Sequence, residues 1–285
     1  MLKNGIIVTL LILLTLSLVA CNKSENRSLS TKNEAETLMV DPIVEKHENE
    51  NNPNNQQKLG NNDNNYIINE LNYSKNDDKF KCNIKYPQIS GLSDNEKQKK
   101  INRTLKNEAI KVINYYENPY GSVELSIDYK VTLKNPNILS VQYSGVGSVS
   151  NAAHPNNLFF TTNINIMTGE RLRLKDIVEI DKNFAQKFLN EEFKSMWPEQ
   201  SEALEYFTSE EVQEYFKEAD SLDNIGTEKQ SDVFSYLTTN SLGISISVGH
   251  AIGDHAEFEI KYQNIRENIK TENEIWQGLL HYQNE

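Results

Sequence analysis

The sequence contains few cysteines and has a deficit of positive charge. Its 2 cysteines, Cys21 and Cys82, exclude a small scaffold held together by several disulfides. The 285 residues include 29 lysines and arginines against 41 aspartates and glutamates, so the formal net charge is −12. This balance argues against binding to nucleic acid and against adhesion to anionic lipid headgroups, because phosphates attract basic surfaces. Any attachment to a membrane must therefore come from something other than the charge of the protein.

The sequence also lacks the common catalytic and nucleotide-binding motifs. It contains no G-x-S-x-G nucleophile elbow, no Walker loop and no H-E-x-x-H zinc motif. The segment GVGSVS lacks the third glycine of a dinucleotide-binding loop and follows no βαβ pattern. We therefore expect a protein that is not an enzyme and that needs no cofactor.

Three histidines form the candidate metal site. His154 precedes Pro155, whereas His250 and His255 lie in a second loop beside Asp254. Imidazoles and a carboxylate could hold zinc, or serve an unfamiliar hydrolytic site, if the fold brings these residues together. Their spacing fits no established site, and loops between strands commonly carry exposed histidines. We favour this second interpretation and predict no metal.

The N-terminus has the features of a secretory signal peptide, residues 1–20. Lys3 is followed by an uncharged apolar run from Ile6 to Ala20, which is shorter than the about 20 residues that a membrane span needs. A short positive region, an apolar stretch and a small residue at its end are typical of a cleaved leader. The alternative is an uncleaved N-terminal anchor.

The residues at the end of this run, Leu18-Val19-Ala20-Cys21, resemble the lipobox of bacterial lipoproteins. The resemblance implies cleavage between Ala20 and Cys21 and a diacylglycerol on the thiol of Cys21. We therefore expect a protein anchored by lipid to the outer face of the cell membrane, in a Gram-positive bacterium. Cys82 would then be a lone thiol, either reactive or, as we favour, a small apolar residue within a strand.

Residues 21–65 have the composition of a disordered tether. The segment HENENNPNNQQKLGNNDNN is rich in asparagine and almost free of large apolar residues. Such a chain cannot bury enough apolar surface to offset the entropy that is lost on ordering. We expect this tether to hold a folded part away from the membrane.

Apolar periodicity after the tether predicts an α+β fold. We expect two small modules, residues 66–165 and 166–268, followed by a C-terminal tail, 269–285. The antiparallel sheets should carry helices packed on one side. Because alternating βαβ units are missing, a doubly wound parallel sheet is disfavoured.

In the first module the sequence predicts a strand that ends at Pro87 and a helix over 94–117. Ser93 and Glu96 form a capping box at the start of this helix. Three strands follow, at residues 123–133, 139–143 and 160–166.

In the second module helical spacing covers 181–197 and 208–219, and Thr208 and Glu211 form a second capping box. Three strands are predicted at residues 232–239, 244–248 and 256–262.

Three glutamates of the last predicted helix, Glu211, Glu214 and Glu218, lie at spacings of three and four on one face. They are the candidate binding residues, as an electrostatic patch for a cationic protein such as lysozyme. The alternative, which we favour, is an ordinary solvated face.

Three segments resemble modules of known proteins. YPQISGL before a capped helix is similar to the N-terminal module found before some bacterial peptidoglycan deacetylases. AAHPNNLFFTTNINIMTGERLRLKDI is similar to the join between that module and an RsiV-type module, and SLGISISVGHAIGDHAEFEIKY resembles the end of the RsiV-type module.

This pair of modules forms the extracellular part of a lysozyme-sensing anti-sigma factor. The resemblance implies an α+β ectodomain at the cell wall, with a wall glycan or a lysozyme-like protein as partner. The deacetylase catalytic domain is absent, and MLKNG is too short for a cytoplasmic sigma-binding domain, so neither activity is carried over. We expect a non-catalytic, lipid-anchored binding protein. The alternatives are an uncharacterised hydrolase and an accessory subunit of a wall-processing enzyme.

Overall fold

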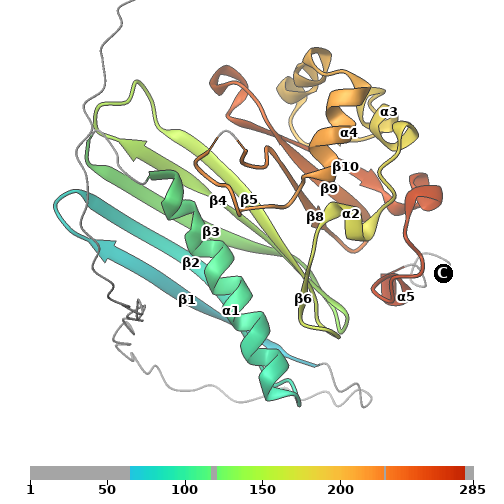
Figure 1. The fold of residues 1–285 in the computed structure, drawn as a ribbon, viewed down its shortest axis with the longest axis horizontal. Coiled ribbons are helices and arrows are strands. Elements are labelled where there is room, and N and C mark those ends of the chain that lie inside the picture. The colour runs from blue at the N-terminus through green and yellow to red at the C-terminus, as the bar shows by residue number, and fades with distance from the viewer. Residues whose placement is uncertain (1–64, 117–120, 228, 280–285) are drawn as a thin grey trace, which may run out of the picture. The chain divides into compact units, whose positions relative to one another are not determined.

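The computed structural model describes residues 65–116, 121–227 and 229–279, which form two β-sheets with associated helices (Figure 1). The predicted signal peptide, Cys21 and nearly all of the tether lie outside the described residues. Both sheets belong to one compact unit that begins at Lys58. The division into modules at 165/166 stays a prediction. In the described part of the chain no helix is long and apolar enough to cross a membrane.

The first sheet has six strands in the order β1-β2-β3-β4-β5-β6. Its strands are β1 (Ile67–Asn76), β2 (Phe80–Ser90), β3 (Val123–Lys134), β4 (Ile138–Val149), β5 (Asn156–Asn165) and β6 (Glu170–Leu172). Neighbouring strands are antiparallel except β2 and β3, which are parallel and joined through a helix. The predicted α+β class is confirmed, but this parallel pair within the sheet was not predicted.

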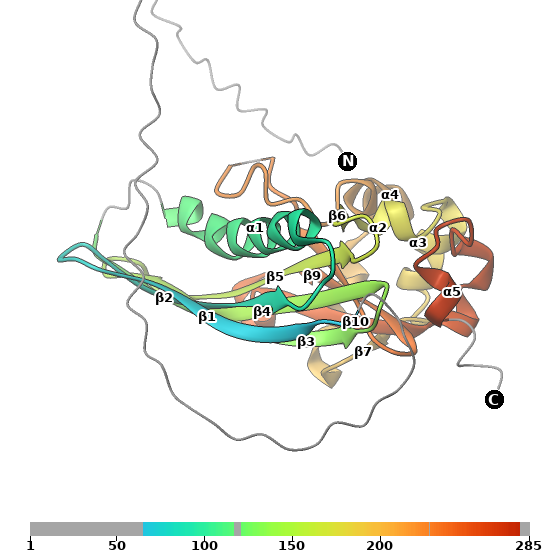
Figure 2. The same ribbon diagram turned by 90° about the horizontal axis from the view of Figure 1, so that it is seen from below.

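The helix that joins β2 and β3 is α1 (Asn95–Lys111), and it lies over one face of the sheet (Figure 2). It continues as a 3₁₀ turn, η1 (Val112–Tyr116). The predicted cap was wrong by one residue, because the side chain of Asp94, not Ser93, accepts the hydrogen bond from Lys97 N. Both residue types can cap a helix, so sequence pattern alone does not separate them.

Two features of the first two strands differ from prediction. β1 was not predicted, because its sequence IINELNYSKN does not alternate and most of its residues are exposed. β2 does not end at Pro87 but runs on to Ser90. Proline lacks an N–H donor, yet it is tolerated here because the ladder with β3 ends at Ile84 and leaves Pro87 paired on one side only.

The second sheet has four strands in the order β7-β10-β9-β8. These are β7 (Lys194–Ser195), β8 (Val233–Leu237), β9 (Ser241–Ser247) and β10 (His255–Lys261). The remaining helices are α2 (Leu174–Ile177), α3 (Lys182–Leu189), α4 (Ser209–Lys217) and α5 (Trp276–Leu279), with 3₁₀ turns η2 (Pro198–Tyr206), η3 (His250–Ile252), η4 (Tyr262–Asn264) and η5 (Arg266–Asn268).

Helices α3 and α4 pack on the second sheet through a cluster of phenylalanines. The ring of Phe188 contacts those of Phe193, Phe216 and Phe258 at centroid distances of 5.0–5.3 Å. The capping box of Thr208 at the start of α4 is confirmed. The helix predicted over 181–197 is shorter than expected, because α3 ends at Leu189 and the chain then forms β7.

Part of the segment that we expected to be a C-terminal tail is packed in this core. Ile275 and Trp276 are buried, and Trp276 Nε1 donates to Ile177 O at 3.3 Å. The prediction of a tail from residue 269 is therefore wrong for residues 269–279, because a buried tryptophan anchors them.

The two sheets meet where the outer edge of β8 lies against side chains of β4 and β5. Leu237 N donates to Ser140 Oγ at 2.9 Å, and Ser235 O accepts from Thr161 Oγ1 at 2.6 Å and Asn163 Nδ2 at 2.9 Å. These side chains alternate along their strands with apolar residues that pack beneath α1, such as Val141. The polar face of β4 and β5 is therefore buried from solvent at this contact.

Asp220 completes the contact between the sheets. It is buried, with a φ of 63°, and its carboxylate accepts from Ser235 N and from Leu174 N at 2.7 Å. The hydroxyls of Ser235 and Thr161 add bonds at 2.6 Å and 3.4 Å. Burial raises the pKa of Asp220 from 3.8 to about 6, although these bonds oppose the rise. One carboxyl group thus connects β5, β8 and α2.

The raised pKa of Asp220 gives the fold a distinct pH dependence. The stability that the neutral carboxyl provides is complete below the unfolded value of 3.8 and is lost as the pH rises through about 6. Relative to Asp220→Asn, which cannot titrate, the free energy of unfolding of the wild type should fall by roughly 3 kcal/mol between about pH 4 and about pH 7.

Urea denaturation across this pH range measures the difference. The matched control is Asp232→Asn, since Asp232 is exposed and its carboxylate has no hydrogen-bond or ion-pair partner among the described residues. If the difference in the free energy of unfolding between the wild type and Asp220→Asn stayed constant across this pH range, the raised pKa of Asp220 would be contradicted.

Candidate functional site

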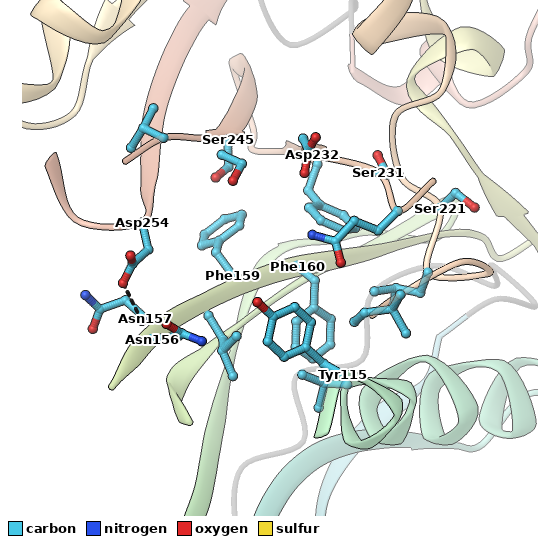
Figure 3. A pocket seen from close by; sticks show the side chains of 18 residues that line it. Tyr115, Asn156, Asn157, Phe159, Phe160, Ser221, Ser231, Asp232, Ser245 and Asp254 are labelled. Atoms are coloured by element: carbon cyan, nitrogen blue, oxygen red, sulfur yellow. Dashed lines mark hydrogen bonds between the residues drawn. The ribbon is translucent and has the colours of Figure 1, made fainter. Parts of the chain in front are cut away.

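A cleft of about 280 Å³ lies at the junction of the two sheets (Figure 3). Its walls come from β5, from η1, from the segments 221–227 and 229–232, and from β8, β9 and the loop after β9. These elements are far apart in the sequence, so the cleft exists only because β8 docks against β4 and β5.

Aromatic rings form the apolar surface of this cleft. Phe159, Phe160 and Phe234 line it, and Tyr115, which is 40% exposed, lies at its border. The ring of Phe159 is held by the ring of His255 at a centroid distance of 5.0 Å and by Tyr236 at 6.3 Å. A flat apolar surface in a fixed orientation can contact the C–H face of a sugar or another ring.

Polar side chains without internal partners lie along the same cleft. Ser245 is 2% exposed, and its hydroxyl has no hydrogen-bond partner among the described residues. The carboxylate of Asp232 is likewise unpaired within that part of the chain. Gln230 uses only its Oε1, which accepts from Gly226 N at 3.1 Å. Donors and acceptors thus remain available for a ligand.

The segment 221–227 is fixed by Asp223 as well as by the preceding Asp220. Lys111 Nζ lies 2.7 Å from Asp223 Oδ1, and Arg173 Nη2 lies 3.0 Å from Asp223 Oδ2. The hydrogen bond from Lys111 is the largest cause that lowers the pKa of Asp223 to about 2, with the charges of Arg171 and Arg173 adding to it. This wall of the cleft is therefore tied to α1 and to the chain that follows β6.

Asp254 ties the loop after β9 to β5 at the other end of the cleft. Its carboxylate accepts from Asn157 N at 2.7 Å and contacts His250 Nδ1 at 2.9 Å. Burial opposes ionisation, but these two bonds outweigh it and hold the pKa of Asp254 below its usual value. The ring of His154 stacks on that of His250 at a centroid distance of 3.5 Å.

The three candidate histidines are thus only partly brought together. His154 and His250 stack on each other, whereas His255 contacts Phe159, and its Nε2 lies 3.6 Å from Glu257 Oε1. Among the described residues no group of three histidine, cysteine or acidic side chains is arranged to hold a metal ion. The His250–Asp254 pair has the geometry of an oriented base, but no hydroxyl or thiol of the described residues is bonded to His250.

The three candidate glutamates at α4 are exposed, but two of them already have partners within the described residues. Glu211 accepts from Thr208 N at 2.9 Å as part of the capping box, and Glu214 pairs with Lys217 at 2.7 Å. Glu218 follows the last turn of the helix. The patch that we considered for a cationic protein is therefore weaker than its sequence suggests.

Cys82 lies in β2 with 5% of its surface exposed and has no disulfide partner in the described part of the chain. Burial raises the pKa of its thiol, which disfavours the reactive thiolate. Its position agrees with our preferred interpretation of a small apolar strand residue.

A second, more apolar cavity of about 480 Å³ adjoins the first. The two share Asp232, Ser247 and Val248, and the second is bordered by Phe207 and Tyr215. Sequence reasoning missed both cavities. The adjacent pair Phe159-Phe160 was an available signal, since neighbouring strand residues face opposite sides and only one ring can pack beneath α1.

Comparison with known proteins finds one family model that is similar to the first part of this chain. Residues 73–156 match the family model described as deacetylase PdaC. The match runs from β1 to the start of β5 and confirms the similarity of the first module to the deacetylase-associated module. It covers less than half of the chain and assigns no catalytic residue. The similarity to an RsiV-type module stays a prediction.

Two solved structures resemble the chain at low sequence identity. A DUF3298 family protein from Pseudomonas aeruginosa is 11% identical, with a TM-score of 0.46 over 73% of this chain and 96% of its own. A DUF3298 family member from Bacteroides fragilis is 16% identical, with a TM-score of 0.42 over 72% of this chain and 93% of its own. No curated protein matches the sequence.

Proposed function

We propose that this chain is a non-catalytic protein, anchored by lipid on Cys21 to the outer face of a bacterial membrane, whose folded part binds a cell-wall glycan. The observation that supports glycan binding is the cleft at the sheet junction. It combines a fixed aromatic surface at Phe159 with unpaired polar side chains at Ser245 and Asp232. Sugars present both an apolar C–H face and a set of hydroxyls, so they match such a lining.

An enzymatic role is the alternative, and the His250–Asp254 pair is the observation that favours it. A hydrolase would need a nucleophile or an activated water beside His250. The aromatic and hydroxyl groups of the cleft are instead suited to holding a ligand without transforming it, and we therefore favour a binding protein. An accessory role beside a wall-processing enzyme is compatible with this function.

A cationic protein such as lysozyme is the second candidate partner, and the exposed acidic residues of α4 and η2 are the observation that favours it. Such a partner would contact Glu211, Glu214 and Glu218, away from the residues that line the cleft. Its binding would therefore be insensitive to changes at Phe159.

Glycan binding is tested with soluble chito-oligosaccharides, which stand in for wall glycan strands. Calorimetry on the full-length chain, in a detergent that contains no sugar, should detect binding. Phe159→Ala should weaken this binding by about tenfold, since losing a stacked ring costs about 1.4 kcal/mol. The control is Trp197→Ala, which removes an aromatic side chain that is 60% exposed and does not line the cleft. Equal affinities of the two variants would contradict the assignment of the cleft.

Lipid anchoring is tested by labelling cells with a radioactive fatty acid. Cys21→Ala removes the thiol that the lipobox resemblance assigns to acylation, so the label should disappear from the protein and the chain should leave the membrane fraction. Equal incorporation of the label into the wild type and the variant would contradict the proposal that the protein is a lipoprotein.

A further inference from the structure

The charged side chains that line the cleft are all acidic among the described residues. They include two carboxylates, those of Asp232 and Asp254, and no lysine or arginine among the described residues that form the walls. The neighbouring cavity, which shares Asp232, is also lined without a basic side chain in that part of the chain. An anionic ligand would meet no counter-charge in either cavity.

The two carboxylates differ in what they already bind. Asp254 is occupied, because Asn157 N and His250 Nδ1 both contact its oxygens within 3.1 Å. The carboxylate of Asp232 has no hydrogen-bond or ion-pair partner among the described residues, although its backbone carbonyl accepts from Ser247 N at 2.7 Å, and Asp232 lies where the two cavities join. Asp232 is therefore the carboxylate that is free to pair with a ligand.

Ser245 provides a second and independent sign of a polar ligand. Its side chain is 2% exposed, its hydroxyl has no partner within the described part of the chain, and it opens onto the cavity. Figure 3 shows Ser245 and Asp232 on one side of the cavity, across from Tyr115 and Asn156. The hydroxyl oxygen of Ser245 is not among the fully enclosed unpaired polar atoms of the described residues, so it is accessible from the cavity, and a ligand group with hydrogen-bonding capacity fits beside it.

From this arrangement we infer that the glycan recognised by the cleft carries an unsubstituted amino group, as a de-N-acetylated amino sugar does, and that its ammonium pairs with Asp232. The inference rests on the proposed glycan-binding function. Phe159 contacts the apolar face of the sugar ring, and the hydroxyl of Ser245 bonds a sugar oxygen or the amine. The net charge of −12 favours approach of such a cation.

The test compares two tetrasaccharides of the same backbone, one built of N-acetylglucosamine and one of glucosamine. Titration calorimetry uses the full-length chain in sugar-free detergent, at a slightly acidic pH where the sugar amines are protonated. We expect the glucosamine tetrasaccharide to bind at least about tenfold more tightly. Asp232→Asn should bring the two affinities to within about twofold of each other.

Glu199→Gln is the matched control, because it removes an exposed charge that does not line the cleft. It should leave the preference intact. If it weakens binding as much as Asp232→Asn does, the attraction is general and the inference is overturned. Equal binding of both sugars by the wild type, sensitive to Phe159→Ala, would overturn the inference and leave the proposed function standing. Binding of neither sugar would overturn both.

Discussion

The outward N–H and C=O groups of a buried edge strand need hydrogen-bond partners, and in this protein β8 finds them outside its own sheet. Its Ser235 and Leu237 bond to side chains of β4 and β5 and to Asp220, instead of to a further strand. Unpaired buried backbone groups are costly, so these bonds decide how the two sheets meet.

The cleft follows directly from this docking. Because β8 lies against the polar face of β4 and β5, the start of β5 and the end of β9 form the walls of a hollow beside the contact. Asp220 and Asp223 then fix the segment 221–227 as part of its third wall. The proposed ligand site therefore depends on a structural contact that itself contains no ligand-binding group.

Local patterns in the sequence were sufficient to predict much of the fold. The helix that begins after Thr208 was identified from its capping box, and the strand predicted at 123–133 from its alternation was found as β3. The docking of the sheets was beyond such reasoning. Ser140 is buried because it bonds to Leu237, which lies 97 positions away in the sequence. Ser245 lies between two isoleucines in ISISV, and Asp220 follows Glu218 and precedes Asp223, so both have the local pattern of exposed polar residues although both are buried.

Hydrogen exchange at individual amides tests the docking of β8 most directly. The amides of Ser235 and Leu237 point away from β9 and would exchange quickly if β8 were an open edge. The account predicts that both exchange as slowly as the amides that bond β8 to β9, because Asp220 and Ser140 hold them. Rapid exchange of Ser235 and Leu237 beside a protected β9 would contradict it, and with it the origin of the cleft.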